Sequence, residues 1–275
     1  QSRKYDNFFP SLALSFPLGK VQMQLAYRAS IKRPTYWDLR GNILYINRYT
    51  YETGNPLLQP TIIQSLSLNT VYRWMSLSFS YNHYKNDYTS YVRAYSEENP
   101  TIGLLTREHI APYNRLSASL TLSPVIGKWS PRWGVQVQRY DCKVDTPQGV
   151  ETFDNPLAIL SWRNTVKFTD SFWINADAYY QTKSQTDNTE YLENSWYMNL
   201  NLYKGFLNNR MSLQLQVTDL FNTRKSHVLM YSGLRTMELD NEMRRTVSLT
   251  FRYKFNPTKS KYKGTGAGQS QKARM

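Results

Sequence analysis

The sequence predicts an all-β fold, an antiparallel up-and-down transmembrane β-barrel with about eleven strands in this chain. Three observations predict it. Apolar and polar residues alternate in segment after segment, as in Met-Ser-Leu-Gln-Leu-Gln-Val-Thr at 211–218. The connections between these segments are alternately short and long. Aromatic residues are abundant, with 22 Tyr, 11 Phe and 7 Trp in 275 residues, and many lie beside the short connections.

The alternation indicates strands because successive side chains of a strand point to opposite faces of a sheet. One face can then meet hydrocarbon while the other stays hydrated. Between residues 76 and 82 the apolar partners are Leu, Phe and Tyr, and the polar ones are Ser and Asn. Small uncharged partners fit a hydrated barrel interior. A soluble β-sandwich shows the same alternation, so a soluble all-β binding module remains an alternative.

Alternation and turn residues together place the strands. They centre on residues 8–16, 21–33, 61–72, 75–93, 104–122, 132–143, 157–168, 173–184, 191–203, 211–222 and 243–255. Short connections are expected at 17–20, 72–74, 126–129, 169–171 and 207–210. Longer polar connections are expected near 34–60, 94–103, 144–156, 185–190 and 223–242. Short periplasmic turns and long external loops are the asymmetry of outer-membrane barrels.

Aromatic and cationic residues are expected at opposite ends of the strands. A membrane-interface girdle beside the short turns would contain Trp74, Trp129, Trp133, Phe172, Trp173, Phe206, Tyr253 and Phe255. The cations toward the long loops are Arg28, Lys32, Arg33, Arg40, Arg48, Arg93, Arg107, Arg139, Lys143, Arg224, Arg235, Arg244 and Arg245. Outer-membrane lipid and lipopolysaccharide phosphates are the partners that this end suits, because Arg pairs well with phosphate. A merely solvated loop face is the alternative.

Other classes of protein find little support in the sequence. No stretch of roughly 20 apolar residues offers a transmembrane helix. The single Cys142 excludes an internal disulfide framework. The net charge of +14 is spread along the chain and forms no nucleic-acid motif, so no nucleic-acid partner is expected.

The search for reaction chemistry predicts no enzyme, no cofactor and no metal site. His83, His109 and His227 lie far apart in the sequence without helical pairing. The glycine run at 264–268 follows the last strand and precedes no helix, so a nucleotide site is implausible. Asp219, at the end of a strand, is expected to serve as a turn or lumen hydrogen-bonding residue.

An odd number of strands indicates that part of the barrel lies outside this chain. Bacterial single-chain barrels have even strand numbers, and an open sheet edge is not tolerated in lipid. No signal peptide stands at Gln1, which indicates a mature piece or a fragment. Residues 1–256 are therefore assigned to a carboxyl-terminal barrel portion, and 257–275 to a polar periplasmic tail.

Several segments, in order, carry a family resemblance. They are Ile-Lys-Arg-Pro-Thr-Tyr-Trp-Asp-Leu at 31–39, Tyr-Thr-Tyr at 49–51, Gly-Asn-Pro-Leu-Leu-Gln-Pro at 54–60, Val-Thr-Asp-Leu-Phe-Asn-Thr at 217–223, and a closing strand at 244–255. Together they resemble the carboxyl-terminal barrel half of the TonB-dependent outer-membrane receptors. Thr61 is a departure, because family members usually have Glu at that place.

The resemblance implies a 22-stranded barrel in the bacterial outer membrane that encloses an amino-terminal plug. Such a receptor imports an external ligand into the periplasm with energy from the TonB complex, which acts through the plug. The amino-terminal barrel half and plug would be partners absent from this chain, and the carboxyl terminus would be periplasmic. A passive porin-like barrel or a structural barrel subunit is the alternative within the membrane. The imported ligand stays undetermined.

The long connection 34–60 is the expected recognition surface. It combines rigid aromatic area with cationic donors, a pairing that suits ligand contacts. The candidate ligand-binding residues are Tyr36, Trp37, Arg40, Tyr45, Arg48, Tyr49 and Tyr51. The alternative is that these side chains pack the loop onto the barrel mouth.

Overall fold

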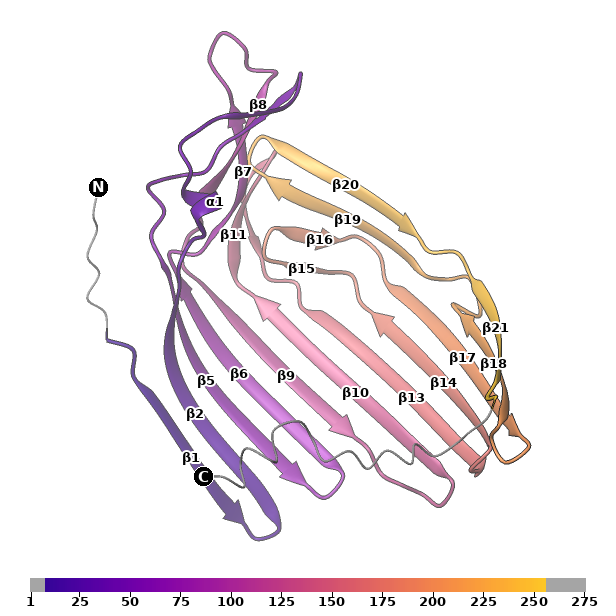
Figure 1. Ribbon diagram of the computed structural model, residues 1–275. Coiled ribbons are helices and arrows are strands. Elements are labelled where there is room, and N and C mark those ends of the chain that lie inside the picture. The colour runs from indigo at the N-terminus through magenta and orange to yellow at the C-terminus, as the bar shows by residue number, and fades with distance from the viewer. Residues whose placement is uncertain (1–7, 256–275) are drawn as a thin grey trace, which may run out of the picture.

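A computed structural model describes residues 8–255 and shows an eleven-stranded antiparallel sheet (Figure 1). The predicted strand number and antiparallel arrangement are confirmed. In sheet order the strands are β1 (Ser11–Leu18), β2 (Val21–Lys32), β5 (Thr61–Tyr72), β6 (Met75–Lys85), β9 (Tyr113–Leu122), β10 (Trp129–Tyr140), β13 (Leu157–Thr169), β14 (Phe172–Gln181), β17 (Ser195–Phe206), β18 (Met211–Thr218) and β21 (Thr246–Tyr253). The tail assigned to 257–275 lies outside the described residues.

The short connections join neighbouring strands at one end of the sheet, which we call the short-turn end. Several of them place residues in the left-handed region, with φ values of +62° at Gly19, +51° at Arg73 and +61° at Asn209. Tight hairpin turns need such angles because their twist must match that of the flanking strands. Each strand of the sheet therefore returns beside the one before it, which gives the up-and-down order.

The two faces of the sheet follow the alternation read in the sequence. Leu25, Leu68, Phe79 and Ala118 are successive cross-strand partners in one apolar row. The other face carries polar pairs, such as a Ser65 hydroxyl that donates to the Asn82 amide oxygen at 2.7 Å. On the apolar face of β21, Leu249 is 65% exposed and Phe251 is 62% exposed. Within residues 8–255 the apolar face is not packed against a second sheet, unlike in a sandwich.

The long connections hold regular structure of their own, most of which lies outside the strands predicted from the sequence. They contain α1 (Tyr36–Leu39), β3 (Leu44–Asn47), β4 (Thr50–Glu52), β7 (Tyr88–Ala94), β8 (Gly103–His109), β11 (Cys142–Thr146), β12 (Gly149–Phe153), β15 (Ser184–Thr186), β16 (Thr189–Tyr191), β19 (Lys225–Ser232) and β20 (Arg235–Glu242). Two four-stranded sheets and a hairpin result, in the orders β3-β4-β8-β7, β15-β16-β19-β20 and β11-β12. We call these elements and their connections the loop crown.

Two strands predicted as continuous, 75–93 and 104–122, are each broken where the barrel sheet meets the crown. β6 ends at Lys85, and Asn86 turns the chain with a φ of +57°. On the partner strand, Pro112 lies between β8 and β9 and has no N–H to continue the ladder. The same hairpin is therefore shared between two sheets.

A small buried cluster ties the crown to the strands beneath it. It contains Tyr113, Cys142, Val144 and Phe153, each at most 6% exposed. Tyr84, Tyr140 and Tyr231 pack around it. The cluster joins β9 of the barrel sheet to hairpins that lie far from it in the sequence. In the described part of the chain, α1 is the one helix, and no helix is long and apolar enough to span a membrane.

Asp219 organises the turn that follows β18. It is fully buried, and its carboxylate accepts hydrogen bonds from the N–H of Thr223 at 2.9 Å and of Arg224 at 3.0 Å. Its own N–H donates to the side-chain oxygen of Asn199 at 2.9 Å. The backbone at Asp219 has a φ of +52°, a conformation that Asp tolerates better than most residues. The predicted role as a turn residue is confirmed.

Replacement of Asp219 by Ala is expected to destabilise the protein by roughly 1–3 kcal/mol, because two partly buried N–H groups lose their acceptor. Thermal unfolding of the full-length protein in detergent, followed by circular dichroism, measures the change. Asp154→Ala is the matched control. It removes a half-exposed ion pair with Arg139 and should cost at most about 1 kcal/mol. Equal losses in the two variants would contradict the assigned role.

Candidate functional site

The loop that carries the predicted recognition residues begins with a helix cap. Thr35 precedes α1 and accepts a hydrogen bond from the Asp38 N–H at 3.2 Å, while the Asp38 carboxylate accepts from the Thr35 N–H at 3.0 Å. This reciprocal pair is a capping box, which satisfies N–H groups left free at a helix start. The single helical turn therefore forms from local sequence.

Asp38 also links this turn to the β7–β8 hairpin. Its carboxylate accepts from the Tyr88 hydroxyl at 3.2 Å and from Arg107 Nε at 3.3 Å. Burial by itself would raise the pKa of Asp38, but the hydrogen bonds from Thr35 and Tyr88 and the charge of Arg107 outweigh it and lower the pKa. Asp38 is therefore held ionised as an anchor of the loop.

The Gly-Asn-Pro-Leu-Leu-Gln-Pro stretch packs against both the helical turn and β8. A Cβ at Gly54 would lie 2.5 Å from the Asp38 carbonyl oxygen, so the close approach requires glycine. The Asn55 amide donates to the Arg107 carbonyl at 2.9 Å. Thr61, at the end of the stretch, is fully buried, and its hydroxyl donates to Asp87 Oδ1 at 3.2 Å. The motif thus fixes the loop on the crown.

The seven predicted ligand-binding residues fall into two groups in the structure. Tyr36, Trp37, Tyr45 and Tyr49 are exposed, and the Arg48 guanidinium lies 4.6 Å from the Tyr49 ring centre.

Arg40 and Tyr51 make internal contacts instead. The buried Arg40 guanidinium lies 3.4 Å from the Trp37 ring centre and forms an ion pair with Glu52 at 3.2 Å. Tyr51 stacks on Tyr95 with ring centres 4.7 Å apart and meets the edge of Tyr45. The two residues support the exposed aromatic side chains beside them.

Arg235 joins the two crown sheets, a contact that sequence reasoning did not anticipate. The β19–β20 hairpin reaches across to β7 and β8 (Figure 1), and Arg235 lies at its tip. Its guanidinium donates to the Tyr49 carbonyl at 2.8 Å and to the Thr50 hydroxyl at 3.0 Å. A Cβ at Gly103 would lie 2.8 Å from the guanidinium carbon. No local pattern signals a contact between residues 186 apart in the chain.

A cavity of about 200 Å³ lies beneath this hairpin tip. Residues of β7, β8, β11, the β15–β16 turn and the end of β19 line it. Glu108, Asp145 and Asp187 bring carboxylates to it, and Tyr91 and Tyr231 bring aromatic rings. The sequence prediction singled out none of these residues, because they come from four separate connections.

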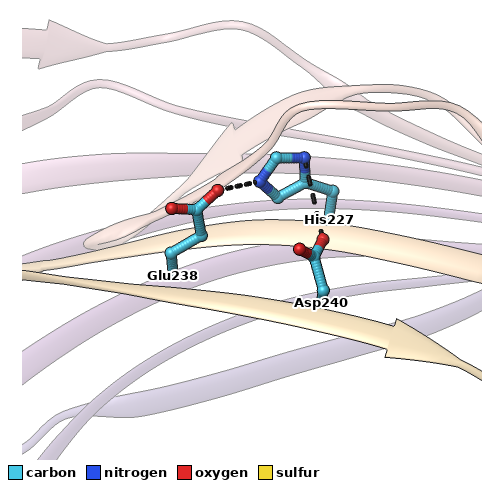
Figure 2. A group of neighbouring side chains, drawn as sticks. All are labelled: His227, Glu238 and Asp240. Atoms are coloured by element: carbon cyan, nitrogen blue, oxygen red, sulfur yellow. Dashed lines mark hydrogen bonds and ion pairs between the residues drawn. The ribbon is translucent and has the colours of Figure 1, made fainter.

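A second group of side chains meets on one face of the β19–β20 hairpin (Figure 2). His227 Nε2 lies 2.6 Å from Glu238 Oε1, and Nδ1 lies 3.8 Å from Asp240 Oδ1. One ligand atom from each residue lies within 4.8 Å of the others, so the group has donors for a metal ion. The hydrogen bond that His227 donates to the Glu238 carboxylate raises the pKa of His227, and the charges of Asp240 and Glu193 act in the same direction. Protonation removes the lone pair that a metal needs. The contacts are those of an imidazolium between two carboxylates.

The polar face of the barrel sheet has a hollow of about 370 Å³ over β13, β14 and β17. Arg163 and Asp177 form an ion pair there at 3.3 Å. Tyr179 stacks on Tyr197 with ring centres 5.1 Å apart. This surface offers charged and aromatic contacts to whatever occupies the concave interior.

Comparisons with known proteins identify the group to which this architecture is related. The model of the outer membrane protein beta-barrel family matches residues 1–253. No protein of curated function matches the sequence significantly.

Solved structures with the same fold are siderophore receptors. A mutant ferric enterobactin receptor, PfeA of Pseudomonas aeruginosa, in complex with enterobactin is 17% identical with a TM-score of 0.56, over 89% of this chain and 40% of that one. The siderophore receptor PirA of Pseudomonas aeruginosa is 14% identical with a TM-score of 0.58, over 79% and 39%. PirA of Acinetobacter baumannii is 13% identical with a TM-score of 0.54, over 90% and 41%. The chain thus spans about 40% of these receptors.

Replacement of Arg40 by Met is expected to loosen the loop, because Glu52 loses its nearest cation and Trp37 loses its stacking partner. The local opening free energy of β3 and β4, measured by hydrogen exchange, should fall by roughly 1–3 kcal/mol. Arg48→Met serves as the control, since the exposed Arg48 contacts only a ring face. This substitution should change the local opening free energy by about 0.5 kcal/mol or less. Similar exchange in both variants would refute the supporting role of Arg40.

The β19–β20 hairpin is expected to be more stable in mild acid than in mild alkali. The pKa of His227 is raised in the folded hairpin, so its stabilising charge is present below the ordinary value of 6.5 and is lost as the pH rises through the folded value. Hydrogen exchange, corrected for intrinsic rates, should show more protection of 225–242 at about pH 6 than at about pH 8.5. His227→Gln should remove the difference. If the pH difference in protection persists in His227→Gln, it arises from the titration of another group.

Proposed function

Because the chain belongs to the outer membrane protein beta-barrel family, we propose that it is the carboxyl-terminal barrel portion of a TonB-dependent receptor. Such a receptor binds an external ligand and carries it into the periplasm with energy from the TonB complex. The observation that carries the proposal is the eleven-stranded sheet, which superimposes on about 40% of siderophore receptors. The family is typically not enzymatic, in agreement with the absence of a catalytic motif from the sequence.

The edges of the sheet support a partner within the same barrel. Among the described residues, β1 pairs only with β2, and β21 pairs only with β18. Unpaired backbone groups are too costly to leave in hydrocarbon, so both edges need further strands. The partner we propose is an amino-terminal barrel half together with a plug that fills the interior. The charged and aromatic hollow on the polar face suits contact with such a plug.

The orientation follows from the two kinds of connection. Short turns face the periplasm in barrels of this type, and long loops face outward. We therefore propose that the crown is external, that the carboxyl terminus is periplasmic, and that lipopolysaccharide meets the cations at the crown. In this arrangement Tyr36, Trp37, Tyr45, Arg48 and Tyr49 contact the ligand. Arg40 and Tyr51 hold them in place.

A passive porin-like barrel is the second candidate, and ion conductance separates the two. The full-length protein in a planar lipid bilayer should conduct little, because a plug blocks the interior. Deletion of the predicted plug should open a large, steady conductance. Steady conductance of the undeleted protein would instead support the porin-like barrel. Binding of the purified periplasmic domain of TonB to the undeleted protein, lost in the plug deletion, tests the energy coupling.

A further inference from the structure

The cavity beneath the β19–β20 hairpin tip is closed by segments that are distant in the chain. The Leu234 N–H donates to the Val92 carbonyl at 2.9 Å, and the Ser232 hydroxyl donates to the Ser90 carbonyl at 2.9 Å. Gly233 has a φ of +62°, and a Cβ there would lie 2.5 Å from the Val92 carbonyl oxygen. The roof is therefore held by main-chain contacts that require glycine, and Arg235 fastens its outer end.

The charge of the cavity is opposite to that of the chain. Three acidic residues, Glu108, Asp145 and Asp187, line it together with a single lysine, Lys143. His109 also lines the cavity, and its Nε2 accepts a hydrogen bond from the Gln59 N–H at 2.9 Å. In a protein with a net charge of +14, this cavity is a local anionic site. Such a site attracts cations.

Aromatic rings lie among these carboxylates. Burial, followed by the nearby charges of Asp145 and Glu108, raises the pKa of Tyr91, which keeps it neutral. The Tyr231 hydroxyl donates to Glu190 Oε2 at 2.8 Å, which places a further carboxylate at the hydroxyl end of that ring. Tyrosine faces attract alkylammonium groups in addition to the charge effect.

We propose that this cavity binds a small aliphatic polyamine. A volume of about 200 Å³ lies below the range of roughly 300–1,000 Å³ that drug-sized ligands occupy, so the site takes a short aliphatic amine. The cavity carboxylates do not form a metal-sized cluster. In residues 8–255, only His227, Glu238 and Asp240 do so. Separated anions suit a ligand with several spaced cationic groups better than they suit a single metal ion.

The proposal concerns the crown alone and does not require transport. Its test is titration of the full-length protein in detergent with spermidine, a linear triamine, by isothermal calorimetry at low salt. Triethylene glycol is the neutral linear comparator. Spermidine should bind with an affinity that falls as NaCl is added, because salt screens the attraction. Triethylene glycol should not bind.

Matched variants locate the site. Glu108→Gln and Asp145→Asn should each weaken spermidine binding by roughly threefold to tenfold, and the double variant by more. Glu98→Gln removes the same charge from an exposed residue outside the cavity lining and should leave binding unchanged. Arg235→Gln loosens the roof and should also weaken binding, while the barrel circular dichroism is retained.

Three results would overturn the proposal. They are no spermidine binding at millimolar concentration, equal loss in Glu98→Gln and Asp145→Asn, and competition by ZnCl₂ that vanishes in His227→Gln, which would place the cation at His227, Glu238 and Asp240 instead. Each is distinguishable from failure of the transport proposal, which conductance and TonB binding measure separately.

Discussion

The hydrogen-bonded ladder of the eleven-stranded sheet is the constraint on which the rest of this structure depends. A strand in hydrocarbon has no water to satisfy its N–H and C=O groups, so each must pair with a neighbour. Pairing fixes the side-chain period at two, and the apolar row through Leu25, Leu68 and Phe79 follows from it. The same rule makes the edges at β1 and β21 the places where another part of the barrel is required.

The crown is built on a different principle, because its elements are short and none is stable alone. Its hairpins hold one another through short strand pairings and through polar contacts between distant segments, such as Asp38 with Arg107 and Arg235 with Tyr49. The barrel sheet makes these contacts possible by bringing the five long connections to one end. The crown surface is rigid where glycine and buried polar groups interlock, and open where aromatic side chains project from it.

Local charge in the crown departs from the charge of the whole chain. Arg40 and Arg107 are used to neutralise Glu52 and Asp38, so they add little to the field outside. The cavity under the β19–β20 tip is anionic although the chain carries a net charge of +14. The electrostatic field at this end therefore depends on which charges remain unpaired. Composition is a poor guide to that property.

By itself the sequence determined the number of strands in the barrel sheet, their antiparallel arrangement and the two faces of that sheet, because alternation and turn residues act over a few neighbouring positions. It also indicated the turn role of Asp219, since the Asp-Leu-Phe-Asn context is local. Only the tertiary structure decided that the strands predicted at 75–93 and 104–122 are each broken. It also decided that Arg40 packs against Trp37 and Glu52 and does not project into solvent, and which acidic residues line one cavity. The cavity depends on side chains from four separate connections, and the role of Arg40 depends on its contacts with Trp37 and Glu52. Such contacts leave no periodic trace in a single chain.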